Sequence, residues 1–197
     1  MAKLGFDLII LGAPASGKDT QAALLRKQFS LRSIESGQHW RQLAKQNSPI
    51  GHKLRALVNR GKPAPTSLMK DYLKSELDKT SINKDLMFVG NPRLKPEAQL
   101  LKKLLDARGR DFFAVFISLP EKEVYRRSLV RNSGRSDDSN RIYIQNRISW
   151  HKDLVGDTVK YLRSLKKIKV INGNQPVQKV QQDILKAIHD YQRSRTN

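Results

Sequence analysis

The residues best suited to do chemistry lie in one short segment near the start of the chain. An apolar run at 6–11 is followed by two glycines with a lysine directly after the second, and then by a helical pattern. The backbone N–H groups of such a loop can point together at an anion, and the lysine adds a mobile positive charge. The sequence therefore predicts a phosphate-binding loop at a helix N-terminus. Its residues are Gly12, Ala13, Pro14, Ala15, Ser16, Gly17, Lys18, Asp19 and Thr20.

The elements that must position this loop alternate along the chain. Strand-like apolar runs occur at 6–11, 32–34, 86–89, 112–119 and 168–171. Helical patterns separate these runs, and two of them cover 95–107 and 142–165. Such alternation predicts an α/β fold with a central parallel sheet of about five strands flanked by helices, and with ligands at the carboxyl ends of the strands.

Composition limits the class of protein. The 197 residues contain no cysteine, no signal peptide and no apolar run of membrane length, so we expect one soluble, cytoplasmic domain without disulfides. The four histidines, His151 among them, lack the spacing of metal ligands, so no protein-bound zinc is expected. The net charge of +20 suits polyanions, either nucleotides or nucleic acid, but Lys and Arg are spread along nearly every segment, as in a generally basic surface.

Five segments carry further motifs in a fixed order. Their sequences are GAPASGKDTQ at 12–21, IESGQHWR at 34–41, GNPR at 90–93, GRSDD at 134–138 and NGNQPV at 172–177. In this order they resemble the phosphate loop, the acceptor segment, the second acceptor loop, the lid end and the adenine turn of adenylate kinases and related nucleoside monophosphate kinases. Five ordered motifs are far more specific than a glycine-rich loop alone.

The resemblance covers residues 8–188 and implies a domain organisation. The chain 1–197 would form a single nucleoside monophosphate kinase domain of the P-loop NTPase class. A core of 1–35 and 81–197 would carry a small helical flap for the nucleoside monophosphate at about 36–80. A very short lid loop would lie at about 131–140, where only three residues separate the arginines at 131 and 135.

The resemblance also implies the reaction and its residues. Two polyanions meet when ATP passes a phosphoryl group to a nucleoside monophosphate, so positioned positive charge does most of the catalysis. The implied catalytic residues are Lys18, Arg93, Arg127, Arg135 and Arg147. On the donor side, the ATP-binding residues beyond the loop are Arg127, Arg131 and Gln175. On the acceptor side they are Ser36, Gly37, Arg41, Gly90, Arg93 and Glu97.

Departures from the family pattern leave alternatives open. Val89 stands where the family usually has an acidic residue that positions water around Mg²⁺. Asp19 stands where the family has Gly, and it either supplies that carboxylate or is an acid favoured in the first turn of a helix. The expected position of the family's last arginine is Asn146, so Arg147 replaces it only if the helix is locally displaced.

The expected cofactor is Mg²⁺, bound through the ATP phosphates, and the expected acceptor is AMP. Glu97 takes the place of the family's base-reading Gln, and its carboxylate can accept from the amine of adenine or of cytosine. Gln38 and Asn91 also depart from the acceptor pattern. A kinase for CMP, UMP or another small acceptor is therefore the near alternative, and a nucleotide- or nucleic-acid-binding relative with weakened catalysis is the distant one. The family implies a monomer.

Overall fold

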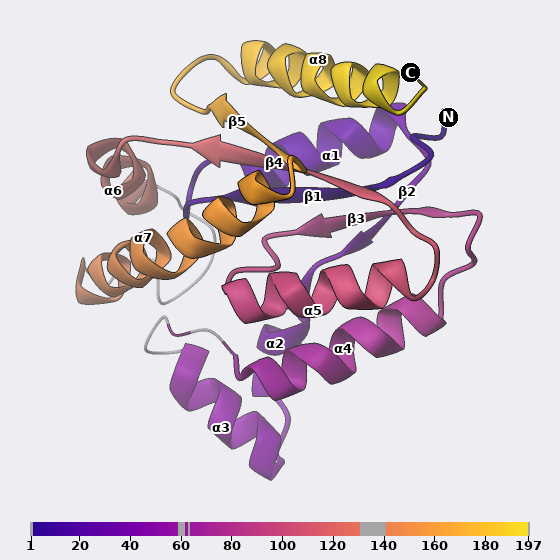
Figure 1. Cartoon of the computed structure of the whole chain (residues 1–197). Coiled ribbons are helices and arrows are strands. Elements are labelled where there is room, and N and C mark those ends of the chain that lie inside the picture. Colours follow the sequence, from indigo (N-terminus) through magenta and orange to yellow (C-terminus); the bar gives the residue numbers. More distant parts are fainter. Residues whose placement is uncertain (1, 59–61, 63, 131–140, 197) are drawn as a thin grey trace.

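A five-stranded parallel sheet forms the centre of the protein (Figure 1). The computed structural model describes residues 2–58, 62, 64–130 and 141–196. In this part of the chain the strands are β1 (Asp7–Gly12), β2 (Leu31–Ile34), β3 (Asp85–Val89), β4 (Phe112–Ser118) and β5 (Ile168–Asn172). Their order is β2-β3-β1-β4-β5, and every neighbouring pair is parallel. The predicted α/β fold with about five parallel strands is confirmed.

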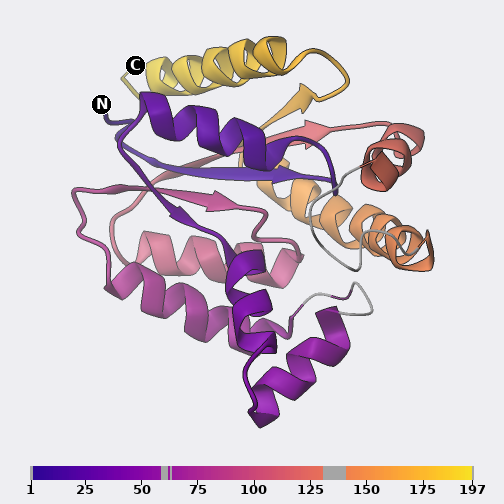
Figure 2. The ribbon, with the colours of Figure 1, turned by 180° about the vertical axis from the view of Figure 1, so that it is seen from behind.

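Helices cover both faces of this sheet (Figures 1 and 2). They are α1 (Lys18–Gln28), α2 (Ser36–Ala44), α3 (Pro49–Val58), α4 (Thr66–Asp78), α5 (Lys95–Asp106), α6 (Glu121–Val130), α7 (Arg141–Ser164) and α8 (Val177–Thr196). Successive strand residues point to opposite faces. Leu8 and Ile10 of β1 accordingly pack in a buried cluster with α1 and α8, whereas Ile9 and Leu11 pack in a second cluster with α4, α5 and α7.

The position of β1 between β3 and β4 determines where ligands bind. The chain passes from β1 to β2 on one side of β1 and later from β3 to β4 on its other side, so a crevice opens at the carboxyl end of β1, where ligands bind in open α/β folds. Gly12 closes β1 opposite Ile117 of β4, and the N–H of Gly90, just after β3, donates to the carbonyl of Ile10 over 2.9 Å. The predicted phosphate loop and the segment 90–93 therefore meet at one edge of the sheet.

The helices of the predicted flap are joined to the core by apolar side chains. Trp40 of α2 and Leu54 of α3 are buried in the same cluster as Leu73 of α4 and Leu101 of α5. Helix α4 lies alongside α5, while α3 lies farthest from the sheet in Figure 1. The division of the chain into a core and a flap at 36–80 stays a prediction.

A buried ion pair anchors the amino-terminal end of β1. Asp7 is 1% exposed and accepts from the guanidinium of Arg110 over 2.7 and 2.6 Å. Its Oδ1 also accepts from the backbone N–H of Leu86 over 2.8 Å, which ties β1 to β3. Burial raises the pKa of Asp7 above its usual 3.8 even though these bonds oppose the shift, and the bond to Asp7 raises the pKa of Arg110.

Arg110→Ala is expected to lower the free energy of unfolding by about 3–5 kcal/mol, because it leaves a carboxylate buried without its partner. Lys186→Ala is the matched control, since Lys186 forms an exposed pair with Asp190 at 2.8 Å. The control should lose much less, because water screens an exposed pair. Urea denaturation measures both variants, and equal losses would contradict the importance given to the buried pair.

Candidate active site

The segment 12–20 forms a tight loop between β1 and α1. Ala15 has φ 56° and Gly17 has φ 86°, and these left-handed residues help to turn successive N–H groups toward one side. The N–H of Ser16 donates to the carbonyl of Ala13 over 3.1 Å. A Cβ at Gly12 would lie 2.4 Å from Ser16 Oγ, so only glycine fits there. The local geometry is that of an anion-binding loop at a helix N-terminus.

Lys18 begins α1 and reaches across the carboxyl ends of two strands. A Cβ at Gly90, which has φ 69°, would lie 3.2 Å from Lys18 Cε. The aliphatic stem of the lysine thus packs against the bare backbone that follows β3. Its Nζ lies 3.8 Å from Oδ1 of Asp19, whose side chain is about half exposed. Gly90 therefore makes room for the lysine as well as turning the chain.

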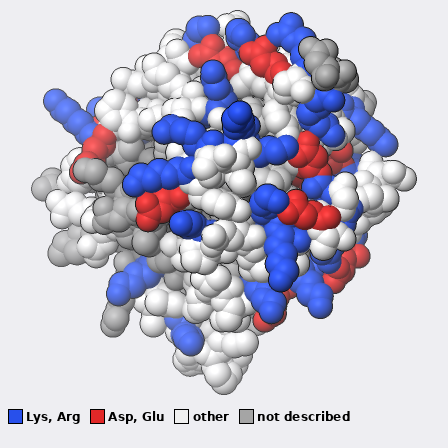
Figure 3. All heavy atoms as spheres, in the orientation of Figure 1, with Lys and Arg blue, Asp and Glu red and all other residues white. Residues whose placement is uncertain are grey.

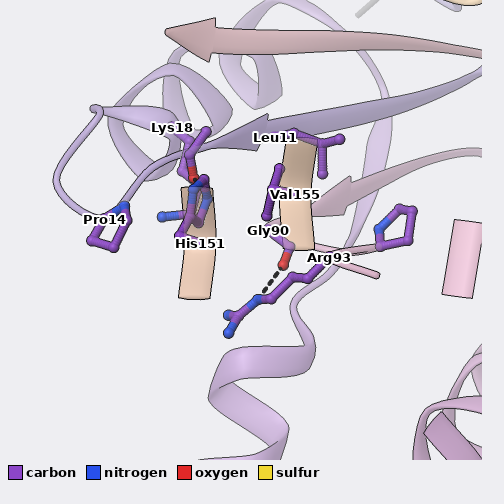
Figure 4. Close-up of a pocket in the computed structure, with 9 residues that line it drawn as sticks. Leu11, Pro14, Lys18, Gly90, Arg93, His151 and Val155 are labelled. Carbon is purple, nitrogen blue, oxygen red and sulfur yellow. Dashed lines mark hydrogen bonds between the residues drawn. The ribbon is translucent and has the colours of Figure 1, made fainter. Parts of the chain in front are cut away.

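Two arginines meet on the side of the crevice that is predicted to take the acceptor. A Cβ at Gly37 of α2 would lie 3.3 Å from Arg41 Nη1 and 3.5 Å from Arg93 Nη2, so both guanidinium groups reach the same point. Arg93 Nε donates to the carbonyl of Gly90 over 2.8 Å, which fixes the orientation of its planar group (Figure 4). Paired guanidinium groups are well suited to hold a phosphate through several hydrogen bonds.

Ser36 and Glu97 are buried beside these arginines. Ser36 is 1% exposed, and its Oγ has no hydrogen-bond partner among the described residues. Glu97 is also 1% exposed, and its Oε2 accepts from the backbone N–H groups of Arg93 and Leu94 over 2.8 and 3.2 Å. Glu97 thus caps α5 and fixes the backbone that carries Arg93, whereas its role in reading the acceptor base stays a prediction.

The Glu97 carboxyl should leave a measurable trace in the pH dependence of stability. Burial raises the pKa of Glu97 above its usual 4.5, although the two N–H bonds oppose the shift. A raised pKa means that this carboxyl stabilises the folded state most at low pH and loses the contribution as pH rises through the folded-state pKa. We define the stability difference as the unfolding free energy of the unmodified protein minus that of Glu97→Gln. This difference is expected to fall as pH rises.

Urea titrations from about pH 2 to about pH 7 would measure this difference and cover the range below the usual pKa of Asp as well. Asp190→Asn provides a control of opposite sign, because Lys186 and Arg193 lower the pKa of Asp190. For Asp190 the corresponding difference should rise with pH. A flat difference for Glu97→Gln would contradict the expectation.

The predicted donor side lies at α6 and the turn after β5. Arg127 on α6 donates through Nε to Glu123 over 2.5 Å and through Nη1 to the carbonyl of Gly173 over 3.3 Å. Bonds from Arg126 and Arg127 lower the pKa of Glu123 to about 2, so Glu123 is a stable anionic partner. In the same turn region, Gln175 donates to Asp183 over 2.7 Å. Arg127 lines a pocket with Ala15, Gly17, Lys18, Asp19 and Thr20.

The side chains of three predicted site arginines lie outside the described residues. Arg131 and Arg135 lie outside the described residues, as do the acidic residues at 137 and 138. Arg147 belongs to α7, but its side chain also lies outside the description. The contributions of these residues to the reaction stay predictions.

Helix α7 brings in a residue that the sequence analysis did not assign to the site. His151 Nε2 lies 3.0 Å from the carbonyl oxygen of Gly12, and His151 lines a pocket with Lys18, Gly90 and Arg93 (Figure 4). Farther along α7, Thr158 Oγ1 donates to the carbonyl of Arg93 over 2.8 Å. His151 and Gly12 are 139 positions apart, so no local spacing could have linked them.

Phosphoryl transfer requires positioned positive charge and little covalent chemistry from the protein. The described residues supply such charge from two sides of one crevice on a parallel sheet, an arrangement suited to a kinase of the P-loop class. Comparison with known proteins narrows this class, because residues 10–167 match the family model of adenylate kinase. The chain belongs to the adenylate kinase family.

Individual relatives extend the match to most of the chain. The adenylate kinase of Bacteroides fragilis is 31% identical over 185 residues, which cover 92% of this chain and 97% of that protein. That of Azobacteroides pseudotrichonymphae is 34% identical over 182 residues, covering 91% and 95%. That of Parabacteroides distasonis is 36% identical over 136 residues, covering 68% and 72%. These matches support a nucleoside monophosphate kinase.

Proposed function

We propose that the protein catalyses reversible, Mg²⁺-dependent transfer of the terminal phosphoryl group of ATP to AMP, which gives two ADP. The observation that carries this proposal is the meeting of Arg41 and Arg93 at Gly37, on the far side of the crevice from the donor loop. A protein that only bound a nucleotide at the loop would need no such pair. The names of the relatives also support ATP and AMP as substrates.

In this proposal the donor phosphates lie in the loop 12–20. The loop N–H groups and Lys18 hold them, and Arg127 lies beside them from α6. Arg41 and Arg93 hold the phosphate of AMP so that one of its oxygens faces the phosphoryl group of ATP. The oxygen attacks phosphorus as the bond to the ADP oxygen breaks, and the cations stabilise the charge spread over the transferring oxygens. Arg131, Arg135 and Arg147 are proposed to close over the reacting groups.

Mg²⁺ would neutralise the donor phosphates when it is bound with ATP. Among the described residues no group of three or more acidic or histidine side chains could hold the metal alone, which fits a metal bound mainly through the nucleotide. Val89 at the end of β3 offers no carboxylate, whereas Asp19 lies at the loop beside Lys18. We therefore propose Asp19, with the hydroxyl of Thr20, as the protein groups that face the metal.

The charge of the surface bears on the alternative partners. On the face in Figure 3, Lys and Arg are spread over most of the outline with Asp and Glu among them, which suits a generally basic protein better than a dedicated nucleic-acid site. No helix in the described ranges is long and apolar enough to cross a membrane. We propose a cytoplasmic monomer with one kinase domain, with the flap at 36–80 and the lid at 131–140.

A coupled assay with ATP, Mg²⁺ and each of AMP, CMP, UMP and GMP tests the proposed function. We expect turnover with AMP to exceed that with the other three acceptors. Preference for CMP or UMP would keep the kinase and replace the acceptor. Binding of ATP without turnover on any of the four would favour a nucleotide-binding relative, and RNA binding that resists salt would then identify its ligand.

A further inference from the structure

One face of α7 contacts both loops of the crevice. His151, Val155 and Thr158 are spaced by four and three residues, so they share a side of the helix. His151 meets the carbonyl of Gly12 in the donor loop, and Thr158 meets the carbonyl of Arg93 on the acceptor side. Val155, which lies between them, is 3% exposed. A single helix therefore contacts the backbone of the loop at 12–20 and the backbone of the segment at 90–93.

The chemistry of the first contact is fixed by its acceptor. A carbonyl oxygen cannot donate, so Nε2 of His151 carries the hydrogen and donates it over 3.0 Å. The accepting carbonyl belongs to the peptide between Gly12 and Ala13, where β1 ends and the loop begins. A bond at this peptide controls the direction in which the loop leaves the sheet. The contact needs only the neutral imidazole, which has one N–H group.

The described side chains pack incompletely beside this hydrogen bond, so the bond matters more for the position of the loop backbone. An apolar cavity of about 470 Å³ lies between the loop residues Ala13 and Pro14, Val124 of α6, and Val155 and Val159 of α7, as far as the described residues define it. Side chains therefore do not fill the space beside the start of the loop. Where packing support is incomplete, a directed hydrogen bond contributes more to fixing a backbone position.

We propose that His151 is a positioning residue that holds the first peptide of the phosphate loop in the geometry that binds ATP. It acts through Gly12 and does not transfer a proton or touch the reacting atoms. Thr158 makes the corresponding contact for Arg93, so α7 fixes the two halves of the crevice relative to each other. The proposal rests on the proposed function only in taking ATP as the ligand of the loop.

Three substitutions at one position separate this role from a general effect on folding. Gln places an amide N–H close to where Nε2 lies, Asn is too short to do so, and Ala removes the donor. We expect His151→Ala and His151→Asn to raise the Kd and the KM for ATP about three- to tenfold, with kcat changed less than about twofold. His151→Gln should stay within about twofold of the unmodified protein. Thr158→Val should raise the KM for AMP instead.

Isothermal titration calorimetry with MgATP and steady-state kinetics supply these constants, and the melting temperature of each variant reports on folding. The proposal would be overturned if Ala, Asn and Gln weakened ATP binding equally, or if none of them weakened it. Calorimetry needs no turnover, so it tests His151 even if no acceptor is phosphorylated. Failure of the proposed function would instead appear as absent turnover in the unmodified protein.

Discussion

Lys18→Ala is expected to lower kcat by a factor of about 10²–10³, while the protein keeps its fold. Loss of one group that stabilises charge only as it develops typically has an effect of this size. Lys18 begins α1, and its stem lies against Gly90 at the junction of the donor and acceptor loops. Among the described residues, no other lysine lines the pocket that Lys18 shares with Gly90 and Arg93 or the pocket that it shares with Asp19 and Arg127. The coupled assay with saturating ATP and AMP measures the loss.

The matched control for Lys18 lies on the same helix. Lys27→Ala removes an exposed lysine from the last turn of α1 and should leave kcat within about twofold of its original value. Circular dichroism melts of both variants would separate a loss of catalysis from a loss of structure. If Lys18→Ala kept more than about a tenth of the kcat of the unmodified protein, the proposed role of Lys18 in stabilising the transferring phosphoryl group would be wrong.

Arg93→Ala should reduce kcat/KM for the acceptor by about 10²–10³, and Arg93→Lys should recover little of it. The guanidinium combines two functions that a lysine cannot perform together, since Nε bonds to the carbonyl of Gly90 while Nη2 reaches the point shared with Arg41. Because the proposed site of ATP lies on the other side of the crevice, the Kd for ATP should change less than about threefold. Initial rates over a range of AMP concentrations, together with ATP calorimetry, test both statements.

A distant arginine serves as the control for Arg93. Arg193 lies on α8, where its bond to Asp190 is exposed, and Arg193→Ala should leave kcat/KM for the acceptor unchanged within about twofold. If Arg93→Ala weakened the binding of ATP and AMP by equal factors, the separation of donor and acceptor sides would be wrong.

Much of the framework could be predicted from the sequence, because burial leaves a periodic signature in it. The strand expected at 86–89 is β3 (Asp85–Val89), and the helix expected at 95–107 is α5 (Lys95–Asp106). Apolar residues at these positions must be buried on one face or both, and this requirement is local. The tight loop between β1 and α1 was also predictable, since its glycines and lysine all lie within 12–18, while its binding of phosphate stays a prediction.

Polar contacts across the fold were not predictable in this way. The bond from Arg110 to Asp7 and the bond from His151 to Gly12 join residues more than a hundred positions apart, so they depend on which groups lie nearby after folding. An arginine after a helix and a histidine in a long helix have many possible partners of similar energy. The sequence specifies which helix face is buried, whereas the partner of each polar group is set by the tertiary arrangement.

The crossing of Lys18 over Gly90 also bears on how this gene can change over generations. Any residue other than glycine at position 90 would be strained at φ 69° and would also push against the lysine at 3.2 Å. Shortening the lysine to relieve that contact would remove its charge from the loop. Changes at positions 18 and 90 are therefore expected to constrain each other.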